Sequence, residues 1–72
     1  MKNIEVDKLY RKNFDQNIQL RKEIMSIQKE YQSAKIVVRP SGTEPVIRLY
    51  VESKSEILNM EILKKLEKII KK

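Results

Sequence analysis

One ten-residue stretch gathers the residue types that bind anions. The segment Arg39–Arg48, RPSGTEPVIR, contains the only glycine of the chain, Gly42, and both of its prolines. Glycine permits close backbone approach or a positive φ, and successive main-chain N–H groups in such a turn can form a nest for an anion. The Ser41 and Thr43 hydroxyls are further donors, and the prolines stiffen the two ends. The stretch therefore predicts an anion-binding loop that is shaped before its ligand arrives.

Two arginines stand at the ends of this stretch. Apolar, β-branched runs in residues 35–39 and 46–52 predict two strands joined by the loop. Because strand side chains alternate between faces, Arg39 and Arg48 are predicted to leave the sheet on the face opposite the apolar residues. Each guanidinium is a planar fork that can hold phosphate through two hydrogen bonds, so the pair suits a phosphate receptor. The alternative is an ordinary hairpin whose arginines only cover an exposed sheet face.

The segments before the hairpin predict a strand and a helix. Alternating apolar residues predict a short strand over residues 3–7, and the charged stretch 8–13 is expected to be a connector. Asp15 is the expected N-cap of a helix that runs to about Gln32. The apolar stripe of this helix, at helical spacing, consists of Leu20, Ile24, Ile27 and Tyr31.

The segment after the hairpin predicts a second helix. Ser53 with Glu56 matches a capping box, and Ser55 is the rival N-cap. The broad apolar face of this helix consists of Leu58, Ile62, Leu63, Leu66, Ile69 and Ile70. The order strand, helix, strand, strand, helix predicts a single α+β domain over residues 1–72, with a small antiparallel sheet and two helices packed on one face.

Composition limits the classes of function. The 72 residues include no cysteine and no histidine, which removes disulfides and imidazole chemistry, and no apolar run is long enough to span a bilayer. A cytoplasmic chain with no membrane contact is therefore expected. The net charge of +6 makes a basic nucleic-acid-binding module the main alternative function. We expect no nucleic-acid partner, because the excess lysines are spaced along the last helix and aromatic residues are few.

Four side chains have roles that the sequence leaves open. Glu44 is expected to order the loop or an arginine, because a carboxylate that faced a bound phosphate would repel it; acid–base work or metal ligation is the alternative. Tyr50 shares the face of Arg48 and could line the ligand side. Ile18 and Met25 lie nearly opposite the apolar stripe of their helix. They are either ordinary surface or a contact to another domain or a second copy.

The hairpin stretch also carries a family resemblance. RPSGTEPVIRLYVES resembles the phosphate-binding loop of the C-terminal domain of α-D-phosphohexomutases and is most similar to the phosphoglucosamine mutase branch. Archaeal phosphomannomutase/phosphoglucomutases are close to it as well. The predicted elements follow the order of that domain, whose fold is of the TATA-box-binding-protein type. The residues that the resemblance implies as binding the non-transferred substrate phosphate are Arg39, Ser41, Gly42, Thr43 and Arg48.

The resemblance implies a reaction that this chain would serve in part. Phosphoglucosamine mutases convert glucosamine 6-phosphate to glucosamine 1-phosphate through a bisphosphate, so the phosphate that is not reacting must be held in either orientation. The family's phosphorylated serine, Asp-rich Mg²⁺ loop and sugar-recognition loop lie on earlier domains, and their motifs do not occur in this sequence. The chain is therefore expected to be a C-terminal fragment of an isomerase, inactive by itself, with Mg²⁺ bound elsewhere. Its expected partners are a hexosamine phosphate and the other domains of the parent enzyme.

Overall fold

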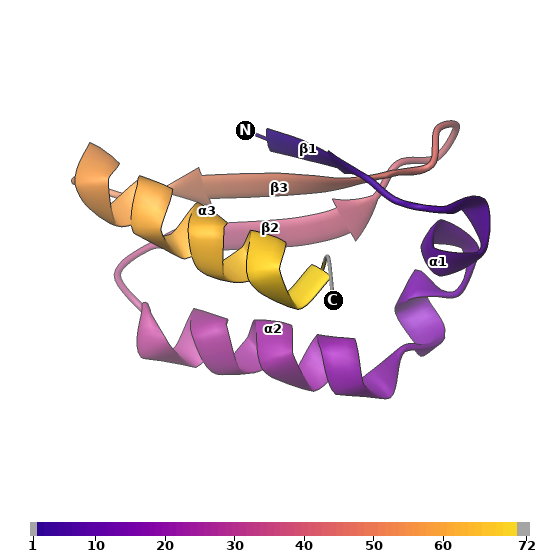
Figure 1. Cartoon of the computed structure of the whole chain (residues 1–72). Coiled ribbons are helices and arrows are strands. Elements are labelled where there is room, and N and C mark those ends of the chain that lie inside the picture. The colour runs from indigo at the N-terminus through magenta and orange to yellow at the C-terminus, as the bar shows by residue number, and fades with distance from the viewer. Residues whose placement is uncertain (1, 71–72) are drawn as a thin grey trace.

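Three antiparallel strands form a sheet in which the last strand of the sequence is central, in the order β1-β3-β2 (Figure 1). The structure is a computed structural model that describes residues 2–70. Its elements in chain order are β1 (Lys2–Glu5), α1 (Lys8–Lys12), the 3-10 turn η1 (Phe14–Gln16), α2 (Ile18–Glu30), β2 (Lys35–Pro40), β3 (Val46–Glu52) and α3 (Glu56–Ile70). The predicted α+β fold, with a small antiparallel sheet and its two long helices on one face, is confirmed.

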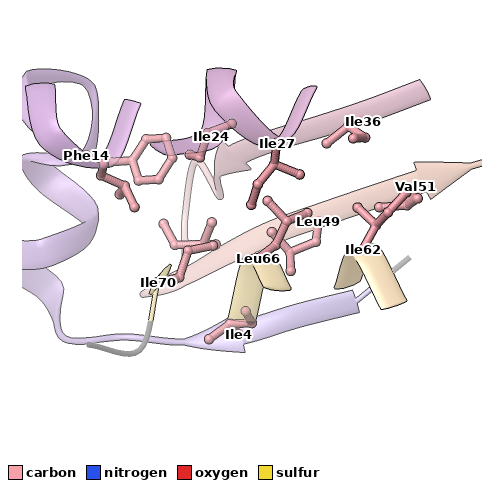
Figure 2. Packing of buried hydrophobic residues seen from close by; sticks show 12 residues of the cluster. Ile4, Phe14, Ile24, Ile27, Ile36, Leu49, Val51, Ile62, Leu66 and Ile70 are labelled. Atoms are coloured by element: carbon pink, nitrogen blue, oxygen red, sulfur yellow. The ribbon is translucent and has the colours of Figure 1, made fainter. Parts of the chain in front are cut away.

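The core lies between one face of the sheet and helices α2 and α3 (Figure 2). The strands contribute the buried side chains of Ile4, Ile36, Ile47, Leu49 and Val51. The helices and η1 contribute Phe14, Leu20, Ile24, Ile27, Ile62, Leu66 and Ile70. Removal of this apolar surface from water is the main favourable term in folding. No helix of the described chain is long and apolar enough to cross a bilayer.

A short helix occupies the stretch expected to be a connector. Asp7 is the N-cap of α1, and its side chain accepts a hydrogen bond from the Leu9 N–H at 3.1 Å. The helix has no buried residue, so the sequence contains no apolar stripe that would predict it. The Val6 N–H donates to the Pro45 carbonyl at 2.9 Å, which brings the start of α1 next to the hairpin loop. The prediction of a connector over residues 8–13 is therefore wrong, because a capped polar helix forms there.

The N-cap of both long helices lies two residues later than the first cap that the sequence suggests. Asn17 caps α2, and its Oδ1 accepts the N–H three residues on at 3.1 Å. Asp15, the predicted cap, lies instead in the preceding 3-10 turn. In α3 the Ser55 Oγ accepts the N–H three residues on at 3.2 Å. The predicted capping box of Ser53 is wrong, because its hydroxyl bonds with Ser55 and Asn59.

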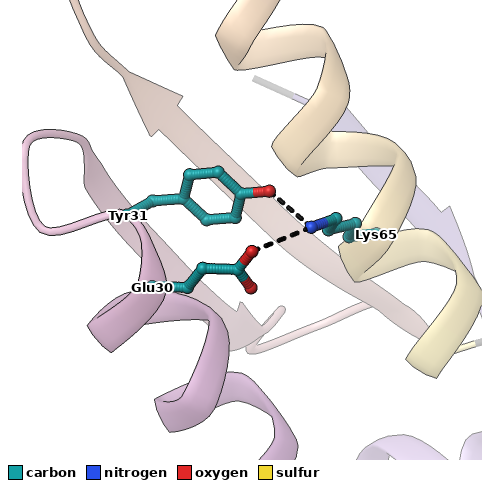
Figure 3. Close-up of polar contacts among 3 residues, drawn as sticks. All are labelled: Glu30, Tyr31 and Lys65. Atoms are coloured by element: carbon teal, nitrogen blue, oxygen red, sulfur yellow. Dashed lines mark hydrogen bonds and ion pairs between the residues drawn. The ribbon is translucent and has the colours of Figure 1, made fainter.

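Helix α3 is held by polar contacts as well as by the core. The Lys65 ammonium forms an ion pair with Glu30 at 3.2 Å and donates to the Tyr31 hydroxyl at the end of α2 (Figure 3). It also lies 4.8 Å from the centroid of the Tyr31 ring. A second ion pair, between Lys2 and Glu67 at 3.0 Å, joins β1 to α3. These contacts connect α3 to both α2 and the sheet.

The outer edge of β2 has no neighbouring strand within the described chain. The Gln28 amide of α2 reaches this strand and donates to the Ile36 carbonyl at 3.1 Å. Pro40, at the end of β2, has no N–H to offer. Part of an edge that could pair with another strand is therefore covered or blunted.

Candidate functional site

The two arginines of the predicted site face each other across neighbouring strands. The β2–β3 register pairs Arg39 directly with Arg48, so both side chains leave the sheet on the same face. This face is opposite the helices, because Ile47 and Leu49, on either side of Arg48, are fully buried in the core. The Asn3 of β1 is the next partner in the same row. The structure thus places both arginines on the face that strand alternation predicts.

Among the residues that the structure describes, this pair of like charges has no carboxylate partner. Directly opposed cross-strand residues have Cβ atoms about 4.5–5.5 Å apart, and like charges at that distance are unfavourable. Within residues 2–70 neither guanidinium forms an ion pair or a hydrogen bond with another residue. Arg39 is exposed but Arg48 is half-buried, so water screens their repulsion only in part. An anion between the two guanidiniums would remove the repulsion.

A hollow of about 410 Å³ lies beside the arginines. Its lining residues are Arg39, Pro40, Ser41, Gly42, Thr43 and Arg48, which include all five residues of the predicted site. A second hollow, of about 200 Å³, lies on the open sheet face and is lined by both arginines too. A hollow of about 490 Å³ beside α1 contains the Asp7 carboxylate and no cationic side chain, so its charge does not suit an anion. We call the hollow of about 410 Å³ the hairpin hollow, and it brings together the cations and hydroxyls that an anion needs.

Ser41 is the centre of the loop's hydrogen bonds. It is only 4% exposed, and its N–H donates to the Val46 carbonyl at 2.9 Å. Its Oγ accepts the N–H groups of Thr43 and Glu44 at 3.4 and 3.3 Å. These amides are predicted to form an open nest, but here the serine holds them, loosely, since usual N–H···O distances are about 2.7–3.2 Å. The Ser41 hydroxyl keeps its own proton for a further acceptor.

The structure tests one of the two reasons that the sequence suggests for Gly42. Its φ is not positive, so a left-handed conformation does not require glycine here, and that expectation is wrong. A Cβ built on Gly42 would meet no protein atom within 4 Å. Gly42 lines the hairpin hollow, and a glycine lets other groups approach its backbone closely. Close approach of a ligand to this backbone stays a prediction.

Glu44 and Tyr50 make their polar contacts away from the arginines. The Glu44 carbonyl accepts the Val46 N–H at 2.8 Å and so closes the loop. Within residues 2–70 the Glu44 carboxylate orients neither arginine, contrary to one expectation, and the backbone of this residue does the ordering. The Tyr50 hydroxyl donates to the Glu52 carboxylate at 2.9 Å, and this hydrogen bond raises the pKa of Tyr50. Tyr50 lines the second hollow, on the face predicted for it.

Arg11 reaches the hairpin loop although sequence reasoning misses it. It belongs to α1, and its Nη1 donates to the Ser41 carbonyl at 3.0 Å. Figure 1 shows α1 at the end of the molecule where the hairpin turns. A polar helix of five residues has no apolar periodicity. The signal that could have revealed α1 is Asp7, a good N-cap followed by residues with no glycine or proline.

The described residues do not fit the Mg²⁺ that the family resemblance implies for a parent enzyme. Within residues 2–70 no three His, Cys, Asp or Glu side chains are close enough together to hold a metal ion. What the hairpin hollow offers chemically is binding and orientation of an anion, by two guanidiniums, two hydroxyls and the main chain at glycine.

The sequence is similar to sugar-phosphate mutases along almost its whole length. Residues 1–69 match the family model for the C-terminal domain of phosphoglucomutase/phosphomannomutase. A phosphoglucosamine mutase of Methanococcus aeolicus is 47% identical to this chain over 36 residues. That match covers 50% of this chain and 8% of the relative, so it spans only a small part of the relative's length.

Proposed function

The chain belongs to the phosphoglucomutase/phosphomannomutase C-terminal domain family, and on this premise we propose that its hairpin hollow binds the phosphate of a phosphosugar. The proposed ligands are the Arg39 and Arg48 guanidiniums, the Ser41 and Thr43 hydroxyls and the main chain at Gly42. The proposed parent protein is an isomerase of the phosphoglucosamine mutase type, with this chain as its C-terminal domain. A phosphomannomutase/phosphoglucomutase is the alternative parent within the same family.

The observation that carries this proposal is the arginine pair without a counter-ion. Arg39 and Arg48 are directly opposed, on one face, and lack an acidic partner in the described chain. For the fold alone, a neutral residue at either position would be more favourable. A phosphate dianion beside both guanidiniums would accept charge-assisted hydrogen bonds from each, and each such bond contributes about 1.5–3 kcal/mol.

In the proposed reaction the loop holds the phosphate that is not being transferred. Isomerisation of glucosamine 6-phosphate to glucosamine 1-phosphate through a bisphosphate requires that the intermediate bind in two orientations. A site that recognises only the charge and geometry of phosphate suits both orientations. Binding energy at this distal phosphate positions the reacting end of the sugar. The phosphorylated serine and the Mg²⁺ of this reaction are proposed to belong to other domains, so this chain alone is proposed to be inactive.

The amino sugar is proposed over glucose and mannose because of one relative. The Methanococcus aeolicus protein, 47% identical over 36 residues, is a phosphoglucosamine mutase. The residues of the hairpin hollow suit phosphate rather than a sugar ring, so we propose that other domains select the sugar. Glucosamine 6-phosphate is therefore the probe of choice for the site.

The single glycine provides a direct test. Labelling with [15N]glycine gives one amide signal in an NMR correlation spectrum, because Gly42 is the only glycine of the chain. We expect glucosamine 6-phosphate and inorganic phosphate to shift this signal until it saturates. Unphosphorylated glucosamine, the matched control, should leave it in place. A Gly42 signal that ignores both phosphates at every concentration would defeat the proposal.

The charge of +6 favours nucleic-acid binding as a second candidate function. Such binding would weaken steeply with salt, because it releases counterions from the phosphate backbone. We propose that the chain has no nucleic-acid partner, since the basic residues at the hairpin line a single hollow and aromatic residues on which bases could stack are few. Two results together would favour nucleic-acid binding instead. The chain would bind single-stranded RNA with an affinity that falls as salt is added, and the RNA would reverse the shift of the Gly42 signal that glucosamine 6-phosphate causes.

A further inference from the structure

Helix α1 directs one side chain to the hairpin loop. The Arg11 Nη1 donates to the Ser41 carbonyl at 3.0 Å, from a position 30 residues earlier in the chain. Arg11 is half-buried, whereas Lys8, Leu9 and Lys12 of the same helix are exposed. The helix therefore places this guanidinium against the loop.

The Ser41 carbonyl depends on this donor. Ser41 is 4% exposed, and its other polar atoms are bonded inside the hairpin: the N–H with Val46 and the Oγ with two loop amides. A buried carbonyl without a donor is unfavourable, and a hydrogen bond from a charged group is stronger than one from a neutral group. Arg11 supplies that bond from outside the hairpin.

Fixing this carbonyl also fixes the next amide. The Ser41 C=O and the Gly42 N–H belong to one planar peptide unit, and the described chain has no cis peptide bond. In a trans unit these two groups point in opposite directions. While Arg11 holds the oxygen on one side, the Gly42 N–H faces the other. A glycine without this tether could adopt other backbone angles at little cost, and the peptide unit could turn.

We propose that Arg11 is a positioning residue that locks the Ser41–Gly42 peptide unit, so that the Gly42 N–H is presented to the phosphate in the hairpin hollow. This inference rests on the proposed function of that hollow. Arg11 is not among the residues that line the hollow, so it acts through the loop rather than on the ligand. Its effect is preorganisation, which lowers the ordering that binding requires.

Arg11→Met tests this role, and Arg21→Met is the matched control. Arg21 also donates through Nη1 to a main-chain carbonyl, that of Asp15 at 3.1 Å, but it does not line the hairpin hollow. Each substitution removes one positive charge and keeps an unbranched stem. Arg11→Lys, which retains the charge and a donor, is the second variant and should recover part of the binding. Circular dichroism verifies that every variant is folded.

The Gly42 amide reports the result. In ligand-free Arg11→Met its NMR signal should shift or broaden, whereas Arg21→Met should resemble the native chain. Inorganic phosphate at constant ionic strength should bind Arg11→Met about tenfold more weakly, because binding must then order a peptide unit that the Arg11 hydrogen bond no longer holds. The loss should persist at high salt, because a lost contact, unlike a lost surface charge, is not screened.

The possible failures are distinguishable. Native phosphate binding by Arg11→Met, with an unchanged Gly42 signal, would overturn the role of Arg11 and leave the phosphate site standing. A loss that disappears at high salt would also overturn it, because Arg11 would then act only as a distant charge. A native chain whose Gly42 signal ignores phosphate would overturn the phosphate site and, with it, the role of Arg11.

Discussion

Arg39 and Arg48 oppose each other in a way that suits a ligand better than it suits the fold. Arg39→Met should leave the free energy of unfolding of the ligand-free chain unchanged or raise it by a few tenths of a kcal/mol, because it removes a like-charge cross-strand pair. The same substitution should weaken binding of glucosamine 6-phosphate at least about tenfold through loss of a charge-assisted contact. Urea unfolding and titration of the Gly42 amide signal measure the two effects.

Lys35→Met is the control for this prediction. Lys35 lies on the same open face but at the other end of β2, where the strand register places it opposite Glu52. Its substitution changes the net charge by the same amount. Its effect on phosphate affinity should stay within about twofold at physiological salt. Equal losses in the two variants would mean that net charge alone governs binding and that Arg39 has no special place.

At the scale of the elements, helix α2 depends on a cap that lies two residues beyond the predicted one. The Asn17 Oδ1 satisfies a main-chain N–H of the first turn, whereas the side chain of Asp15 caps nothing in this helix. Asn17→Ala should therefore lower the free energy of unfolding by about 1 kcal/mol, a typical loss for an N-cap. Asp15→Ala should cost clearly less in the same urea titration. A larger loss of stability for Asp15→Ala than for Asn17→Ala would indicate that Asp15 is the N-cap.

The contact between α2 and α3 predicts sensitivity to alkali. The hydrogen bond with Tyr31 and, second, that with Glu30 raise the pKa of Lys65. A lysine with a raised pKa contributes stability that is complete below its unfolded value of 10.5 and is lost as the pH rises through the folded value. Tyr10 and Tyr50 also have a raised pKa, so their contributions fall in the same direction. The urea midpoint should therefore begin to fall near about pH 10.

Lys65→Met shows whether this contact is responsible. The variant should lose less stability between neutral and alkaline pH than the native chain does. Lys64→Met, at an exposed neighbouring position of the same helix, should keep the native alkaline loss. Identical curves for all three proteins would assign the alkaline loss to other groups.

At the scale of the whole molecule, one small core provides most of the free energy that stabilises the fold. Stabilities of about 0.05–0.15 kcal/mol per residue correspond to roughly 4–11 kcal/mol for 72 residues. Leu66 is fully buried, so Leu66→Ala should remove about 2–5 kcal/mol and lower the thermal midpoint sharply. Leu9→Ala, at a residue 65% exposed, is the control and should have little effect. Thermal unfolding followed by circular dichroism separates the two.

Repeated patterns made most of this molecule predictable. The apolar spacing of Leu66 and its neighbours predicts α3, and residue alternation in the hairpin is enough to place Arg39 and Arg48 on the open face. Each of these conclusions rests on several residues that agree. The fold and the arginine pair therefore follow from local sequence.

Single contacts made the rest unpredictable. The bond from Arg11 to Ser41 joins residues 30 positions apart, and neither residue shows by type or spacing that it needs the other. Asn17 and Asp15 are both good N-caps, so the choice between them depends on small differences in packing. The capture of two amides by Ser41 depends on the bend of the loop itself.

The hydrogen bond from the Gln28 amide to the Ile36 carbonyl also hinders edge-to-edge association of two copies of the domain. The run Ile36, Val37 and Val38 is β-branched throughout, and an exposed edge strand of this kind is a template for pairing with another chain. By covering part of this edge, the Gln28 amide raises the protein concentration at which one molecule begins to pair with the next and aggregate.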